Sequence, residues 1–134
     1  MSQGPPTRVL VVEDDAMTLA SIADTLQDDG AVVTALMSGS EFMALLAEAA
    51  EASPQVLVVD VNLGGGMSGF DVARMADARW PGIAVIYVTG DLRAVVRNVL
   101  GPRDLCLLKP FTDEALRRMM RAVPGGVAET SKQG

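Results

Sequence analysis

Two short aliphatic runs in this sequence each end directly on carboxylates. Residues 9–12 (VLVV) are followed by Glu13 and Asp14, and residues 56–59 (VLVV) are followed by Asp60. Runs of four or five aliphatic residues are typical of strands that are buried on both faces of a parallel sheet. If these two strands are neighbours, the three carboxylates meet at one edge of the sheet. A buried cluster of this kind requires a neutralising cation, because burial and mutual repulsion both raise carboxyl pKa values.

The rest of the chain alternates between strand-like and helix-like segments. Strands are expected at residues 8–13, 31–36, 55–60, 83–89 and 105–108. Helices are expected at residues 16–28, 41–50, 69–79, 91–100 and 113–123. Gly30 is expected to end the first helix, and Ser40 to cap the second. This alternation predicts an α/β fold in which five helices cover both faces of a doubly wound, five-stranded parallel sheet.

The pattern of strands and helices fits one domain. We expect this domain over residues 8–123, between a flexible N-terminal tail at residues 1–7 and a flexible C-terminal tail at 124–134. No second domain follows it in this sequence. The chain is therefore expected to act as a stand-alone module.

Composition excludes several classes of protein. The net charge of −6 argues against a nucleic-acid partner, because binding to a phosphate backbone needs a basic surface. No apolar run is long enough to cross a membrane, and the single cysteine, Cys106, fits a reducing compartment, so we expect a cytoplasmic protein. The chain has no histidine, which excludes imidazole bases and histidine zinc sites. Any site must use carboxylates, hydroxyls, amides, backbone atoms and lysine.

Two more polar residues stand where predicted strands end, and both extend the carboxylate cluster. Thr89 ends the fourth strand and Lys109 follows the fifth. Ligands of such sheets bind beyond the carboxyl ends of the strands. Because Mg²⁺ prefers a few carboxylates, water and phosphate oxygens, we expect Asp14, Asp60 and the backbone carbonyl of Asn62 to bind it.

A metal at this position favours phosphoryl chemistry at Asp60. An aspartate can attack phosphorus and become an acyl phosphate. The oxygens of the transferred group then need stabilisation beyond the metal. The Lys109 ammonium, the Thr89 hydroxyl and the Gly90 amide are the groups expected to supply it.

Four motifs together resemble the receiver domain of bacterial two-component response regulators, of the single-domain chemotaxis type. They are VLVVEDD at 9–15, VLVVDVNL at 56–63 with MSGF at 67–70, IYVTGD at 86–91, and LLKPF at 107–111. The resemblance implies a flavodoxin-like strand order, 2-1-3-4-5. It implies that Asp60 accepts a phosphoryl group from the phosphohistidine of a partner histidine kinase or histidine phosphotransfer protein. The absence of histidine then makes sense, because the donor is another protein.

The resemblance also assigns roles to the other residues. It implies that Glu13 and Asp14 form the acidic pair of a Mg²⁺ site, and that Thr89 and Lys109 sense the phosphate. It further implies a cis peptide bond between Lys109 and Pro110.

The chain departs from the family pattern at three places. Cys106 stands where receivers usually carry Tyr or Phe, which makes switching by an inward-turning aromatic doubtful; we expect a small core residue there. The segment from Thr89 to Lys109 is short, so we expect a shortened fourth helix. Residues 64–66 (GGG) replace the usual Pro-Gly and add a residue after Asp60; they form either a plain surface loop or a flexible one that alters access to Asp60.

Three functions remain open from the sequence. The first is a stand-alone receiver with no independent enzymatic turnover, which signals by binding an unknown target protein or by passing the phosphoryl group on. The second is a phosphohydrolase of the aspartyl-phosphate type, although Asn62 stands where that class carries a second acid. The third is a receiver-like scaffold that is not phosphorylated. The cognate kinase, the target and the oligomeric state stay open.

Overall fold

A computed structural model describes residues 5–48, 53–96, 101 and 103–123. Residues 1–4 and 124–134, which make up most of the expected tails, lie outside the described residues. So do residues 49 and 50, which the sequence assigned to the second helix, and residues 97–100, which it assigned to the fourth. The tails therefore stay predictions.

The described residues form one parallel sheet of five strands in the order β2-β1-β3-β4-β5. The strands are β1 (Arg8–Val12), β2 (Val32–Leu36), β3 (Val56–Asp60), β4 (Ala84–Thr89) and β5 (Asp104–Leu108). The helices are α1 (Ala16–Asp28), α2 (Gly39–Ala47), α3 (Gly69–Arg79), α4 (Leu92–Val96) and α5 (Asp113–Ala122). The predicted fold class and strand order are confirmed.

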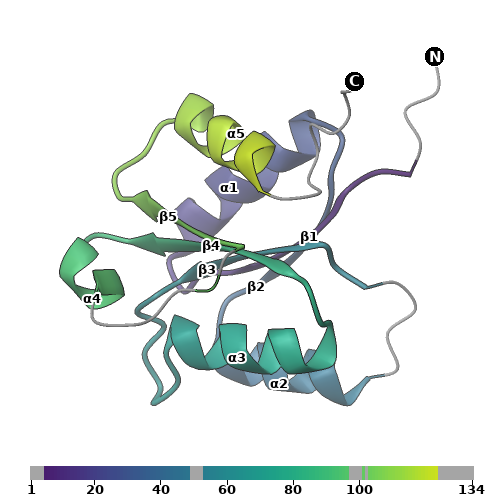
Figure 1. Ribbon diagram of the computed structural model, residues 1–134, viewed down its shortest axis with the longest axis vertical. Coiled ribbons are helices and arrows are strands. Elements are labelled where there is room, and N and C mark those ends of the chain that lie inside the picture. Colours follow the sequence, from purple (N-terminus) through teal and green to yellow (C-terminus); the bar gives the residue numbers. More distant parts are fainter. Residues whose placement is uncertain (1–4, 49–52, 97–100, 102, 124–134) are drawn as a thin grey trace.

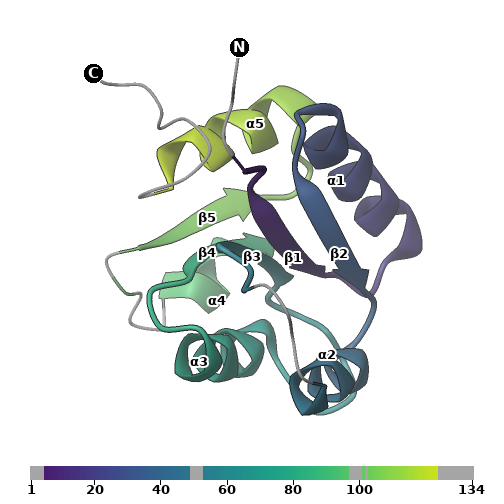
Figure 2. The same cartoon turned by 90° about the vertical axis from the view of Figure 1, so that its right-hand side faces the viewer.

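The helices cover both faces of the sheet, so the sheet separates two apolar layers. Helices α1 and α5 lie on one face, α2 and α3 lie on the other, and α4 contacts β4 (Figures 1 and 2). Every residue of β3 and β4 is buried, because these strands lie inside the sheet between the two layers. Alternate side chains of a strand point into opposite layers, so β3 contributes Leu57 to one layer and Val58 to the other.

Side chains and glycines mark the helix ends. Gly30 has a φ of 91° just beyond α1, and its amide donates to the carbonyl of Gln27 while the next amide donates to that of Leu26. This is a Schellman ending, which the left-handed glycine permits. The expected cap of α2 is wrong: Ser38, not Ser40, accepts a hydrogen bond from the Glu41 amide, so α2 begins at Gly39.

None of the helices in the described part of the chain is long and apolar enough to cross a membrane.

Candidate functional site

The three carboxylates of the aliphatic runs meet at the carboxyl edge of the sheet. Strands β1 and β3 are direct neighbours, with Val12 beside Val59, so the residues that follow them lie side by side. Glu13, Asp14 and Asp60 each offer a carboxylate oxygen, and these oxygens all lie within 4.8 Å of one another. Glu13 and Asp60 are buried, whereas Asp14 is exposed. The cluster therefore has a buried floor and a side that faces solvent.

Lys109 places its ammonium group between the two buried carboxylates. Its Nζ lies 3.0 Å from Oδ2 of Asp60 and 3.2 Å from Oε1 of Glu13. The Lys109 amide donates to the carbonyl of Thr89 at 2.7 Å, which ties the end of β5 to the end of β4. The peptide bond between Lys109 and Pro110 is cis, as the resemblance implied.

Glu13 is the most perturbed carboxyl group of the cluster. Burial raises its pKa to about 7; the nearby Asp60 charge adds to the rise, and the Asp15 amide and the Lys109 charge oppose it. Its Oε2 accepts a hydrogen bond from the Asp15 amide at 3.1 Å. Its Oε1 is buried and accepts no hydrogen bond from any described residue, although Lys109 lies nearby. Burial alone lowers the pKa of Lys109, but the hydrogen bond to Asp60 and the two carboxylate charges raise it above its ordinary value.

Backbone contacts hold Asp60 in place. Its Oδ1 accepts a hydrogen bond from the Asn62 amide at 2.9 Å, while Lys109 holds Oδ2. The amide of Val61, the residue directly after Asp60, donates to the carbonyl of Val88 in β4 at 2.9 Å. Each oxygen of the Asp60 carboxylate therefore has a partner on a different segment. The expected role of the Asn62 carbonyl as a metal ligand stays a prediction.

Thr89 lies at the predicted strand end, but its hydroxyl is engaged with the backbone of the following loop. It is fully buried, accepts from the Asp91 amide at 3.0 Å and donates to the Asp91 carbonyl at 3.1 Å. These bonds turn the hydroxyl toward Asp91. To reach a group on Asp60, the hydroxyl has to leave both of them.

The sequence reasoning missed Asp15. Its amide holds Glu13, and its side chain caps α1 by accepting from the Thr18 amide at 2.9 Å. The signal was present, because an aspartate just before a helical segment is a preferred N-cap.

The sequence comparison decides the family. The family model described as "Response regulator receiver domain" matches residues 9–121, which include every residue of the cluster. The chain belongs to this family.

Named relatives and solved structures agree with the assignment. This receiver is 34% identical over 128 residues to the transcriptional regulatory protein FixJ of Azorhizobium caulinodans, covering 93% of this chain and 58% of that protein. It is 29% identical over 124 residues to the probable transcriptional regulatory protein TcrX of Mycobacterium tuberculosis, and the match covers 91% of this chain and 51% of TcrX. The chain thus spans about half the length of the curated relatives it matches.

Among solved structures, a response regulator receiver protein from Sinorhizobium medicae superposes with a TM-score of 0.72 at 28% identity, covering 87% of this chain and 96% of that one. The chemotaxis response regulator CheY4 of Vibrio cholerae also superposes with a TM-score of 0.72, and the match covers 87% of this chain and 98% of that one. Its identity of 23% makes it evidence for the fold alone.

The donor set of the cluster fits a hard divalent cation. Carboxylate oxygens are the ligands that Mg²⁺ prefers, and the exposed Asp14 leaves room for water. The unbonded Oε1 of Glu13 is a buried oxygen that lacks a hydrogen-bond donor in the described part of the chain. The Lys109 ammonium lies 3.2 Å from this oxygen and offsets its charge without a hydrogen bond, so Oε1 can still accept a metal ion or a water molecule. The chemistry of this cluster therefore supports metal binding by this receiver.

Cys106 occupies the position of the usual aromatic residue and packs as a half-buried part of the core. It lies beside Tyr87 of β4, and burial raises the pKa of its thiol. The aromatic rings of this region come from Tyr87 and Phe70, whose centroids are 5.0 Å apart. Burial also raises the pKa of Tyr87 to about 12.

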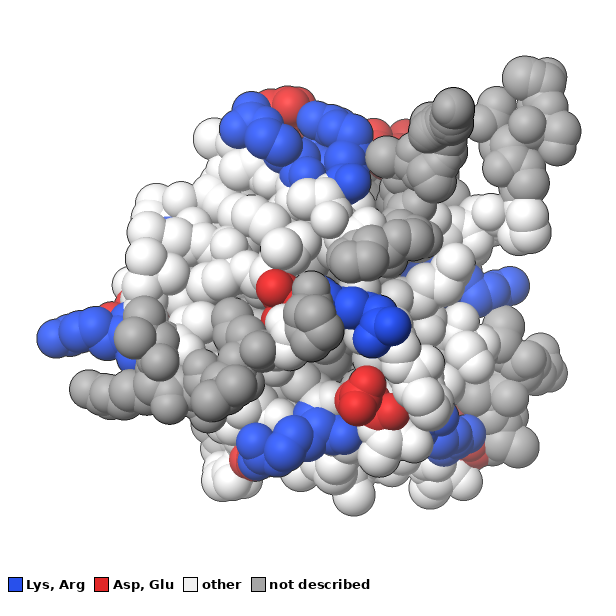
Figure 3. Space-filling model, viewed as in Figure 1, with Lys and Arg blue, Asp and Glu red and all other residues white. Residues whose placement is uncertain are grey.

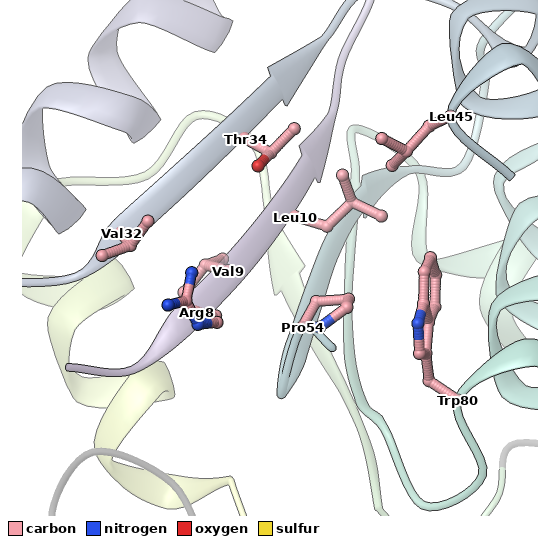
Figure 4. Close-up of a pocket in the computed structure, with 8 residues that line it drawn as sticks. All are labelled: Arg8, Val9, Leu10, Val32, Thr34, Leu45, Pro54 and Trp80. Carbon is pink, nitrogen blue, oxygen red and sulfur yellow. The ribbon is translucent and has the colours of Figure 1, made fainter. Parts of the chain in front are cut away.

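A hollow of about 80 Å³ lies at the opposite, amino-terminal edge of the sheet (Figure 4). Its lining includes Arg8 and Val32, which begin β1 and β2, together with Pro54, Leu45 and the ring of Trp80. None of the residues expected in the site lines it. It is therefore separate from the carboxylate cluster.

On the face shown in Figure 3, basic side chains form separate groups, one of them over α5. There Arg118 and Arg121 pair with Glu114, and Arg117 pairs with Asp29 of the loop after α1. These acidic partners offset the positive charge of the three arginine side chains of α5.

Proposed function

We propose that this receiver accepts a phosphoryl group on Asp60 from the phosphohistidine of a partner histidine kinase or histidine phosphotransfer protein. The observation that carries the proposal is the arrangement of the Asp60 carboxylate. It lies between the Lys109 ammonium and the Asn62 amide, next to two more carboxylates, at the ligand-binding edge of a receiver fold.

The transfer exchanges one bond to phosphorus for another. An oxygen of the Asp60 carboxylate forms the new bond, and the bond between phosphorus and the donor imidazole breaks, so that the imidazole leaves with the electron pair. Lys109, 3.0 Å from Asp60, offsets negative charge on the transferred group. The Thr89 hydroxyl turns from the Asp91 backbone to a phosphoryl oxygen.

Glu13, Asp14, Asp60 and the Asn62 carbonyl are the groups that would hold Mg²⁺. The ion, when bound, neutralises the carboxylates and polarises the phosphoryl oxygens. Asp14 faces solvent and can take part without burying a further charge. Glu13 supplies negative charge from the buried floor of the site.

The output of the domain is proposed to be binding to a protein target or passing on the phosphoryl group. No independent turnover of a substrate is proposed, and no nucleic acid or membrane is assigned to this domain. A single cysteine suits a reducing compartment, and we place the protein in the cytoplasm.

A small phosphodonor tests the proposal without knowledge of the kinase. The protein is incubated with Mg²⁺ and acetyl phosphate or phosphoramidate, and intact mass is followed with time. We expect one phosphoryl adduct in the wild type and none in Asp60→Asn. Asp15→Asn is the matched control, because asparagine caps α1 as well as aspartate does.

Absence of an adduct, or an adduct that persists in Asp60→Asn, contradicts the proposal. Many turnovers of phosphoester substrates without a lasting adduct would instead support a phosphohydrolase.

A further inference from the structure

The first residue of α3 lies directly against the backbone of Asp60. A Cβ atom on Gly69 would stand 2.3 Å from the Asp60 carbonyl oxygen and 2.9 Å from both its carbonyl carbon and the Val61 Cα. The Gly69 amide donates to the Val61 carbonyl at 2.9 Å. These contacts need a residue without a side chain, and they join α3 to Asp60, which ends β3, and to Val61, which follows it.

A structured loop brings Gly69 to this place. Gly64, Gly65 and Gly66 all have positive φ values, between 64° and 85°, which let the chain turn back toward β3. Ser68 then caps α3 in a reciprocal capping box with Asp71. The start of α3 is therefore fixed both by its own cap and by contact with β3.

Neither partner in this contact is free to move away. Helix α3 is anchored by Val72 and Ala76, which are fully buried in the core. The Asp60 backbone is paired with β4 on its other side. An added Cβ on Gly69 would lie 2.3 Å from the Asp60 carbonyl oxygen, whereas ordinary contact begins at 3.4 Å. To accommodate it, α3 and the end of β3 would have to separate by about 1 Å.

That separation would change the site, because the partners of Asp60 sit on other segments. Lys109 follows β5 and Glu13 follows β1, so neither moves with α3. We propose that Gly69 is a positioning residue for the phosphoryl acceptor: its contact with the Asp60 backbone sets the distance from the Asp60 carboxylate to Lys109 and to the acidic pair. The inference rests on the proposed function above.

Gly69→Ala tests the inference against Gly39→Ala, a closely matched control. Both glycines are buried first residues of a helix that a serine caps. A Cβ on Gly39 would meet the side chain of Met67, at 2.7 Å from its Sδ and 3.1 Å from its Cβ. The thioether can turn aside, and the Cβ contact requires a shift of only a few tenths of an ångström, far less than at Gly69. The measured quantity is the rate of adduct formation per folded molecule with acetyl phosphate and saturating Mg²⁺.

In Gly69→Ala we expect the maximal rate to fall by about tenfold or more, since a misplacement of about 1 Å costs up to about a hundredfold. The donor concentration for half-maximal rate should stay unchanged. Because the rate is expressed per folded molecule, a smaller folded fraction does not account for the fall. Gly39→Ala should keep the wild-type rate. A folded Gly69→Ala protein that reacts as fast as Gly39→Ala overturns the inference.

A second pair of variants decides the matter if Gly69→Ala does not fold. Ser68→Ala removes the cap that fixes the start of α3, and Ser38→Ala removes the equivalent cap of α2. Ser68→Ala should react more slowly than Ser38→Ala, and equal rates overturn the inference. A wild-type protein that takes up no phosphoryl group would instead reject the proposed function itself.

Discussion

Replacement of Glu13 by glutamine should stabilise this receiver at alkaline pH when no divalent cation is present. The Glu13 carboxyl is buried, and its pKa in the folded protein is about 7, against an ordinary value of 4.5. Between these two pH values the folded protein holds a proton that the unfolded chain has released. The free energy of unfolding therefore falls as the pH rises through this window. Glutamine keeps the shape of the side chain but cannot ionise.

The size of the effect follows from the pKa. A rise from 4.5 to about 7 corresponds to about 3 kcal/mol, at about 1.4 kcal/mol for each pKa unit. At pH 8 with a chelator, Glu13→Gln should thus be more stable than the wild type by about 3 kcal/mol. At pH 4.5 most of this difference should vanish, because the wild-type carboxyl is then largely protonated.

Urea unfolding followed by tryptophan fluorescence measures this difference, because Trp80 is the only tryptophan and is buried. Comparison with Glu13→Gln at each pH cancels the contributions of titrating groups that do not interact with Glu13, which leaves those of the Glu13, Asp60 and Lys109 cluster. Mg²⁺ at pH 8 should stabilise the wild type more than the variant. A stability difference that stays constant from pH 4.5 to 8 would show that the Glu13 carboxyl does not titrate in this range.

Three further predictions concern other contacts of the fold and the site. Lys109→Gln should lower the free energy of unfolding at pH 8 by about 2 kcal/mol, because it removes the cation between two buried carboxylates; urea unfolding measures this loss. The same substitution should reduce formation of the phosphoryl adduct, which is measured by intact mass. Phe42→Ala should cost about 3–5 kcal/mol in urea unfolding, since the ring is fully buried. Gly30→Ala should cost about 1 kcal/mol by the same assay, because the position has a φ of 91°.

The sheet and the meeting of its carboxylates could be predicted because each depends on a short-range pattern. An aliphatic run such as residues 56–59 is buried on both faces wherever it lies inside a parallel sheet. Once β1 and β3 are neighbours, Glu13 and Asp60 must lie at the same edge. The prediction needed only the strand ends and the parallel topology.

The cap of α2 was predicted wrongly although the sequence carried a better signal. Ser38 is followed three residues later by Glu41, the spacing of a capping box, and the Glu41 side chain accepts from the Met37 amide at 2.7 Å. Ser40 lies in the first turn of the helix and has no such partner three residues later.

Side-chain orientation within the site was beyond sequence reasoning. Thr89 could turn its hydroxyl toward Asp60 or toward the following loop, and only the hydrogen bonds of the folded chain decide between these rotamers. The close approach of Gly69 to Asp60 was equally hidden, because it depends on how α3 packs on the sheet.

Phosphoryl transfer to Asp60, as proposed, requires a divalent cation in the carboxylate cluster beside the acceptor. Diffraction from crystals grown with Mn²⁺ in place of Mg²⁺ tests it most directly, because the anomalous signal locates the metal. We expect one peak within bonding distance of carboxylate oxygens of both Asp14 and Asp60, and no such peak in Asp14→Asn crystals. A wild-type crystal with no peak at the cluster, or with the metal bound elsewhere, would contradict it.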